Sequence, residues 1–100
     1  MDEVTAGVQE RTVWEFPLAL ESRLPIDMPE GAEVLHFNMQ GDTPTIWALV
    51  DEKRNFVSRH FLLAGTGHPM QGEDDSLLDY IGTCFHGPFV WHLFEAKDGS

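Results

Sequence analysis

The sequence has a single cysteine, few basic residues and no long apolar segment. One cysteine, Cys84, cannot form an intrachain disulfide and suits a reducing compartment, so we expect a cytoplasmic protein. The longest apolar runs are only about four to five residues, which is far too short for a membrane-spanning helix. The first residues are acidic and lack an apolar stretch, so we expect no secretory signal there.

Basic residues number 6 against 17 acidic ones, which gives a formal net charge of −11 at pH 7. The acids concentrate in two blocks, residues 1–33 and 73–100, on either side of a neutral centre. This field repels nucleic acids and anionic membranes, because phosphate binding needs clustered Lys and Arg. It would accelerate encounter with a basic partner, although high net charge also keeps a small protein soluble. The predicted partner is therefore the basic surface of a protein or ribonucleoprotein complex, with no direct nucleic-acid binding and no membrane.

Apolar and polar residues alternate along much of the chain, whereas no long window follows a helical period. Between residues 33 and 40, the side chains of Leu35, Phe37 and Met39 should share one face of a strand. Residues 44–50 are apolar on both faces, which is typical of a central strand. Residues 77–86 should form a strand with an irregularity at Gly82.

Turn-forming residues separate these segments about every eight to twelve residues. We therefore predict an all-β fold, a single small domain built as an antiparallel β-sandwich or small barrel of about six or seven strands. The domain should span residues 10–97, between a flexible acidic N-terminus at 1–9 and a tail at 98–100.

Carboxylates from both acidic blocks are the candidate partner-binding groups, because they can stand in for phosphates against Arg and Lys. An exposed tryptophan could anchor such a contact. The candidate residues are Glu73, Asp74, Asp75, Asp79, Glu30, Glu33 and Trp14.

The segment Gly65–Gly72 is the candidate for a small-ligand site. Two glycines spaced by one residue can expose successive backbone N–H groups that bind an anion, so the candidate residues are Gly65, Thr66, Gly67 and His68. The segment lacks the third glycine of a dinucleotide fingerprint and the lysine of a phosphate loop. A tight connection with glycines at positive φ is the alternative interpretation.

Residues for metal binding or catalysis do not form a recognisable motif. The histidines show no H-x-H or H-E-x-x-H spacing, and no C-x-x-C is present. Cys84 and His86 could project to one side of a strand, but a zinc site or a thiol nucleophile needs further partners. We therefore expect no metal, no cofactor and no enzymatic activity.

Six short motifs give the chain a resemblance to a known family. They are Trp14-Glu-Phe, Pro29-Glu-Gly-Ala-Glu-Val-Leu, Ile46-Trp-Ala-Leu-Val-Asp51, Gly65-Thr-Gly-His-Pro69, Tyr80-Ile-Gly-Thr83 and His92-Leu-Phe-Glu95. Over about residues 12–96 the chain resembles a family of small proteins of unknown function found mainly in bacteriophages and prophages. The resemblance implies a phage-encoded β-rich protein in the cytoplasm of a bacterial host. It carries no catalytic or binding residues to transfer.

Three functions are compatible with these observations. The first is a phage-encoded acidic interaction protein that inhibits a host nucleic-acid-binding or defence complex, as an anti-CRISPR protein does by mimicking nucleic acid. The second is a module that binds a nucleotide-like anion through the Gly65–Gly72 loop. The third is a self-associating structural or assembly protein, because a small sheet that is apolar on both faces could bury its second face in a homodimer.

Overall fold

The computed structural model describes residues 10–70 and 73–97, so the predicted flexible N-terminus and C-terminal tail lie outside the described residues. The described chain forms seven strands and one short 3₁₀ turn. They are β1 (Thr12–Pro17), β2 (Arg23–Pro29), β3 (Glu33–Gln40), β4 (Thr43–Val50), β5 (Phe56–Gly65), η1 (Asp75–Leu77), β6 (Leu78–His86) and β7 (Phe89–Ala96). In the described part of the chain, no helix has the length and apolar character needed to cross a membrane.

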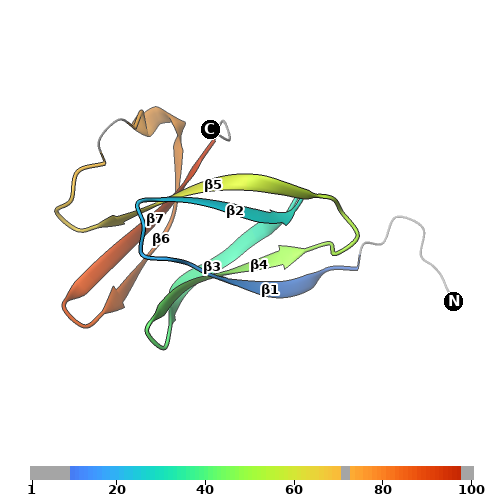
Figure 1. Ribbon diagram of the computed structural model, residues 1–100, viewed down its shortest axis with the longest axis horizontal. Helices are drawn as coiled ribbons and strands as arrows, with labels where there is room; N and C mark the ends of the chain where they lie inside the picture. Colours follow the sequence, from blue (N-terminus) through green and yellow to red (C-terminus); the bar gives the residue numbers. More distant parts are fainter. Residues whose placement is uncertain (1–9, 71–72, 98–100) are drawn as a thin grey trace, which may run out of the picture.

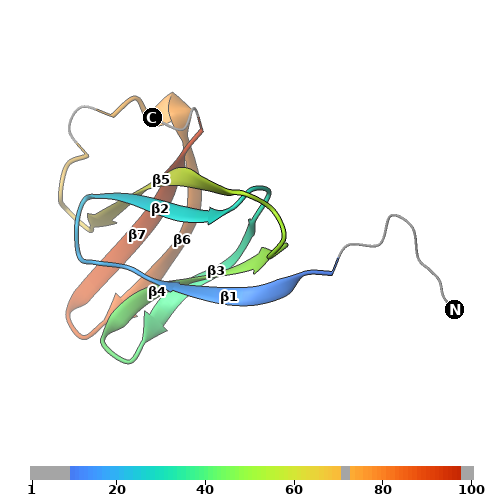
Figure 2. The same ribbon diagram turned by 45° about the vertical axis from the view of Figure 1, so that its right-hand side comes forward.

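The strands form two antiparallel sheets that pack face to face (Figure 1). A three-stranded sheet has the order β1-β4-β3, and a four-stranded sheet has the order β2-β5-β7-β6. The turned view in Figure 2 shows β2 and β5 over β1, β3 and β4, with β6 and β7 running obliquely at one end. The all-β prediction is confirmed, and the architecture is a sandwich that does not close into a barrel.

Strand β4 is the centre of the three-stranded sheet, as its apolar pattern predicts. Ile46, Ala48 and Val50 are fully buried between the sheets. Three prolines lie in edge strands, which tolerate a missing backbone N–H, whereas Pro44 is buried at the second position of β4. Pro17 ends β1, and β2 contains both Pro25 and Pro29.

Strand β3 departs from strict alternation at Leu35. The register with β4 shifts between Val34 and His36, so Leu35 is the extra residue of a β-bulge. Its side chain is 48% exposed, whereas Phe37 is buried. The prediction that Leu35 shares the inner face with Phe37 and Met39 is therefore wrong, because the bulge turns Leu35 away from the core.

The predicted irregularity at Gly82 is confirmed. The pairing of β6 with β7 shifts register between Tyr80 and Gly82. A Cβ atom at Gly82 would lie 3.7 Å from Cβ of Phe37, so β6 passes close to β3 of the other sheet at this point.

An ion pair closes one side of the core. The side chains of Arg59 on β5 and Glu95 on β7 point toward the same inner face as the buried ring of Phe61. Arg59 donates two hydrogen bonds to the Glu95 carboxylate, at 2.7 and 2.8 Å, and one to the carbonyl oxygen of Ala32 in the β2–β3 turn. Hydrogen bonding to Glu95 raises the pKa of Arg59, although burial opposes this shift. The three hydrogen bonds connect three separate parts of the chain.

Candidate functional site

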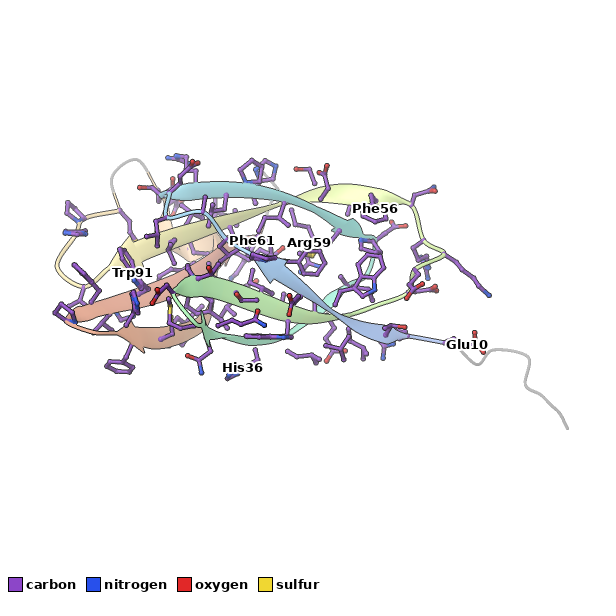
Figure 3. The ribbon with its side chains drawn as sticks, turned by 60° about the horizontal axis from the view of Figure 1, so that its bottom comes forward. Glu10, His36, Phe56, Arg59, Phe61 and Trp91 are labelled. Atoms are coloured by element: carbon purple, nitrogen blue, oxygen red, sulfur yellow. The ribbon has the colours of Figure 1, made fainter. Side chains whose placement is uncertain are left out.

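Aromatic side chains gather where β1 meets the start of β5. The Trp14 ring lies 6.1 Å from the ring of Phe56 and 6.3 Å from that of Phe16. Phe56 is 56% exposed and its neighbour Val57 is also exposed. In Figure 3, Phe56 and Glu10 lie toward one end of the sandwich and Trp91 toward the other. Trp14 and Phe16 are partly buried against the core, so Phe56 and Val57 form the exposed apolar part of this end of the molecule.

Strand pairing brings two predicted acidic residues to this same end. Pro29 is paired with Phe56, and the backbone N–H of Glu30 donates to the Asn55 carbonyl at 2.8 Å. Glu33 begins β3, opposite Leu49 of the central strand. We call the set Trp14, Glu30, Glu33 and Phe56 the acidic aromatic end.

Each carboxylate of the acidic aromatic end has one arginine nearby and stays exposed. Glu30 lies 3.6 Å from Arg54, and Glu33 lies 3.6 Å from Arg11. The Glu30 and Glu33 side chains are 62% and 60% exposed, so these pairs are solvated and weak. A partner's arginine or lysine can compete for these carboxylates, because little energy holds the existing pairs.

The remaining predicted acids lie elsewhere, around η1 and the start of β6. Glu73 pairs with Arg23, and Asp79 lies 3.6 Å from Lys97. Asp74 accepts hydrogen bonds from the backbone N–H and hydroxyl of Ser76, which lower its pKa. Asp75 begins η1. The six predicted acids therefore lie in two separate regions of the surface and do not form one continuous patch.

Most basic residues already have acidic partners. Within the described residues, five of the six lysines and arginines lie in ion pairs: Arg11, Arg23, Arg54, Arg59 and Lys97. The one remaining basic residue of the described chain is Lys53, so these ion pairs account for most of its basic side chains. Which partner the acidic surface meets stays a prediction.

The Gly65–His68 segment is a tight turn. The His68 N–H donates to the Gly65 carbonyl at 3.0 Å, and the Thr66 N–H donates to the Val90 carbonyl at 3.0 Å. Gly67 has a φ of 88°, which favours glycine, whereas Gly65 is not in this region. Two of the N–H groups considered for anion binding are therefore engaged in backbone hydrogen bonds.

A cavity of about 450 Å³ lies beside this turn. Gly65, His68 and Met70 line it together with Trp91 and the Arg23–Glu73 pair. Its volume lies within the range of small-molecule sites, and its wall combines apolar and polar groups. His68 therefore lines a cavity together with Trp91 and Arg23. The sequence pattern alone did not connect these two residues to the loop.

A chain of hydrogen bonds crosses the outer side of the four-stranded sheet. Thr66 Oγ1 lies 2.7 Å from His92 Nε2, and His92 Nδ1 lies 2.9 Å from Thr83 Oγ1. The Thr83 hydroxyl also lies 2.5 Å from the Tyr80 hydroxyl. These contacts tie the turn to β6 and β7. Each residue of this hydrogen-bonded chain belongs to one of the sequence motifs named above. Only the pairing of the strands brings these motifs together.

Cys84 and His86 do not join in a site. The Cys84 thiol is buried in the core, where desolvation raises its pKa. His86 Nε2 instead lies 3.0 Å from the exposed carboxylate of Asp42. Among the residues that the structure describes, no group of three or more His, Cys, Asp or Glu side chains is arranged to hold a metal ion.

Comparison with known proteins identifies a family but no function. Residues 9–100 match the family described as Domain of unknown function (DUF7352), so the chain belongs to this family. Comparisons with curated proteins and with solved structures found no match. The predicted membership of a family of unknown function is confirmed. The predicted phage origin stays a prediction.

Proposed function

We propose that the protein is a non-enzymatic interaction protein that binds a basic partner through the acidic aromatic end. The observation that carries the proposal is the exposed Phe56 ring beside Trp14, with the carboxylates of Glu30 and Glu33 at the same end. Protein interfaces combine aromatic anchors with a polar rim that sets charge preference. Here the anchor would be Phe56 and the rim would select Arg and Lys.

The finer proposal is that this protein is phage-encoded and inhibits a host nucleic-acid-binding or defence complex. A net charge of −11 on 100 residues supports it, because a small acidic domain can occupy a basic channel that normally holds phosphates. The aromatic rings would add contacts that nucleic acid itself does not make. Because a net charge of −11 repels nucleic acid, the inhibitor would act on the protein component of such a complex.

The test is retention of a bacterial nucleic-acid-binding complex on the immobilised full chain, with washes at increasing salt. We expect a basic complex to be retained at low salt and released near 1 M NaCl, since surface charge pairs are strongly screened at about that concentration. Phe56→Ser and the double variant Glu30→Gln/Glu33→Gln should each reduce retention. The matched control Asp42→Asn/Asp79→Asn removes the same number of charges elsewhere and should retain the complex.

Two results would reject this proposal. One is retention that does not change between low and high salt, because the proposed contacts are mainly electrostatic. The other is an equal loss of retention for the Glu30/Glu33 and the Asp42/Asp79 variants, which would show that only total charge matters.

The cavity beside Gly65–His68 favours a second candidate function, a small-ligand module. A nucleotide-like anion would meet Arg23 and His68 there, but also Glu21 and Glu73. Calorimetry with a panel of nucleotides tests this function, with Trp91→Leu as the variant expected to abolish the heat. A panel that gives no heat with the wild-type chain removes a nucleotide as the ligand.

A further inference from the structure

On the outer face of β6 and β7, three successive outward-facing register pairs contain no Asp, Glu, Lys or Arg. Side chains on these strands alternate between core and solvent, and Cys84 and Leu93 are buried on the inner side. The outward-facing pairs are Tyr80 with Phe94, Thr83 with His92, and Phe85 with Val90. We call these six residues the neutral face. It is unusual in a chain of which 23% of residues are Asp, Glu, Lys or Arg.

The neutral face is largely aromatic, partly exposed and held in place by internal contacts. Phe85 is 71% exposed and Tyr80 is 60% exposed. The Tyr80 ring packs edge-on against Phe94 at 5.6 Å, and its hydroxyl joins the hydrogen-bonded chain through Thr83 and His92. A surface whose side chains are already ordered loses little conformational entropy when it is covered. Exposed aromatic patches of this kind usually mark contact sites.

We propose that the neutral face is the contact surface of a homodimer of this chain. Two copies that each carry a charge of −11 repel each other, and the repulsion costs least where no carboxylates face each other. A twofold axis would place the same six residues on both sides of the contact. Interface cores are rich in Tyr and Phe and depleted of charge, which is the composition of this face.

The lack of carboxylates also makes a basic protein a poor partner for the neutral face. An arginine or lysine would find aromatic rings on the neutral face but no carboxylate among its six residues, whereas the acidic aromatic end offers both. The two surfaces therefore serve different contacts. Dimerisation through the neutral face does not depend on the proposed function of the acidic aromatic end.

Salt should act on these two contacts in opposite directions. Screening weakens attraction between the acidic aromatic end and a basic partner, but it also weakens repulsion between two anionic copies. Raising NaCl from about 0.1 M to about 1 M shortens the Debye length from about 10 Å to about 3 Å. The dimer should therefore become tighter over this range while binding of a basic partner becomes weaker.

The experiment is sedimentation equilibrium of the full chain from micromolar to millimolar concentration, at the two salt concentrations. The wild type should approach the mass of a dimer, with a lower dissociation constant at high salt. Phe85→Ser should raise that constant by about tenfold or more, as expected for an aromatic anchor. Phe56→Ser is the matched control, because it removes the same ring at the opposite end and should leave the constant unchanged.

Tyr80→Ser provides a second variant on the neutral face, and circular dichroism verifies that each variant remains folded. A wild type that stays monomeric at every concentration and salt overturns the proposal and leaves the neutral face to a different kind of partner. A dimer that salt dissociates, or that Phe56→Ser disrupts as strongly as Phe85→Ser, also overturns it. Loss of partner retention by Phe56→Ser alone concerns the proposed function and not the dimer.

Discussion

The Arg59–Glu95 pair should be the most sensitive polar contact for stability. Both side chains are 21% exposed, and the two hydrogen bonds between them measure 2.7 and 2.8 Å. Glu95→Ala removes both acceptors and leaves the guanidinium facing the core. Breaking a buried pair by removing one partner costs about 3–5 kcal/mol, and the remaining exposure lowers our expectation here to about 2–4 kcal/mol.

The comparison with a double variant makes this prediction specific. Arg59→Met/Glu95→Leu replaces both charges with apolar side chains, so no uncompensated charge remains near the core. It still removes the donor to the Ala32 carbonyl, which should cost about 1–2 kcal/mol. We therefore expect the double variant to be more stable than Glu95→Ala alone, despite carrying the additional substitution.

Urea unfolding followed by tryptophan fluorescence and circular dichroism measures these free energies. For a domain of this length, Glu95→Ala should also lower Tm by at least about 10 °C. The reasoning is refuted if Glu95→Ala costs less than about 1 kcal/mol, which is the range of an exposed pair. It is also refuted if the double variant is no more stable than Glu95→Ala.

Four further predictions concern the Gly65–His68 loop, two other glycine substitutions and the Cys84 thiol. Gly65→Ala should displace His68 and change the fluorescence of Trp91, because the new Cβ would lie 2.9 Å from His68 Nδ1 and 3.3 Å from Trp91 Cζ3. Gly67→Ala should cost about 1 kcal/mol in urea unfolding because its φ is 88°, whereas Gly82→Ala, whose Cβ would make only ordinary contacts, should cost less. Cys84 should react slowly with a thiol reagent until the chain unfolds, because burial raises its pKa and blocks access. The raised pKa of folded Cys84 should also make stability depend on pH. Once the pH exceeds the pKa of the unfolded thiol, the unfolded chain loses the proton that the folded chain retains, so the free energy of unfolding should fall.

Local patterns in the sequence predict the elements well because each strand buries one face. The apolar segment at 44–50 becomes the central strand, and Gly82 marks the bulge in β6. Leu35 shows the limit of this reasoning. A bulge in β3 depends on the register with β4, so an apolar residue in good alternation can still face solvent.

The candidate sites depend on long-range pairing that alternation does not specify. Trp14 meets Phe56 across the two sheets, and their positions along the chain give no indication of this contact. Several acidic residues also form ion pairs with bases that are distant in sequence, such as Glu73 with Arg23. The two acidic blocks of the sequence therefore do not act as two uniform negative surfaces. Sequence could therefore predict an acidic β-domain with Trp14, Glu30 and Glu33 as candidates, but not that these three would share one end while Asp79 lies elsewhere.

The most direct test of the central claim is an amide NMR titration of the full chain with the retained basic partner. We expect the largest chemical-shift changes at Trp14, Glu30, Glu33 and Phe56, and we expect these changes to diminish with added salt. Changes centred on Tyr80, Phe85 and His92, or on the cavity residues His68 and Trp91, would contradict the acidic aromatic end as the binding surface.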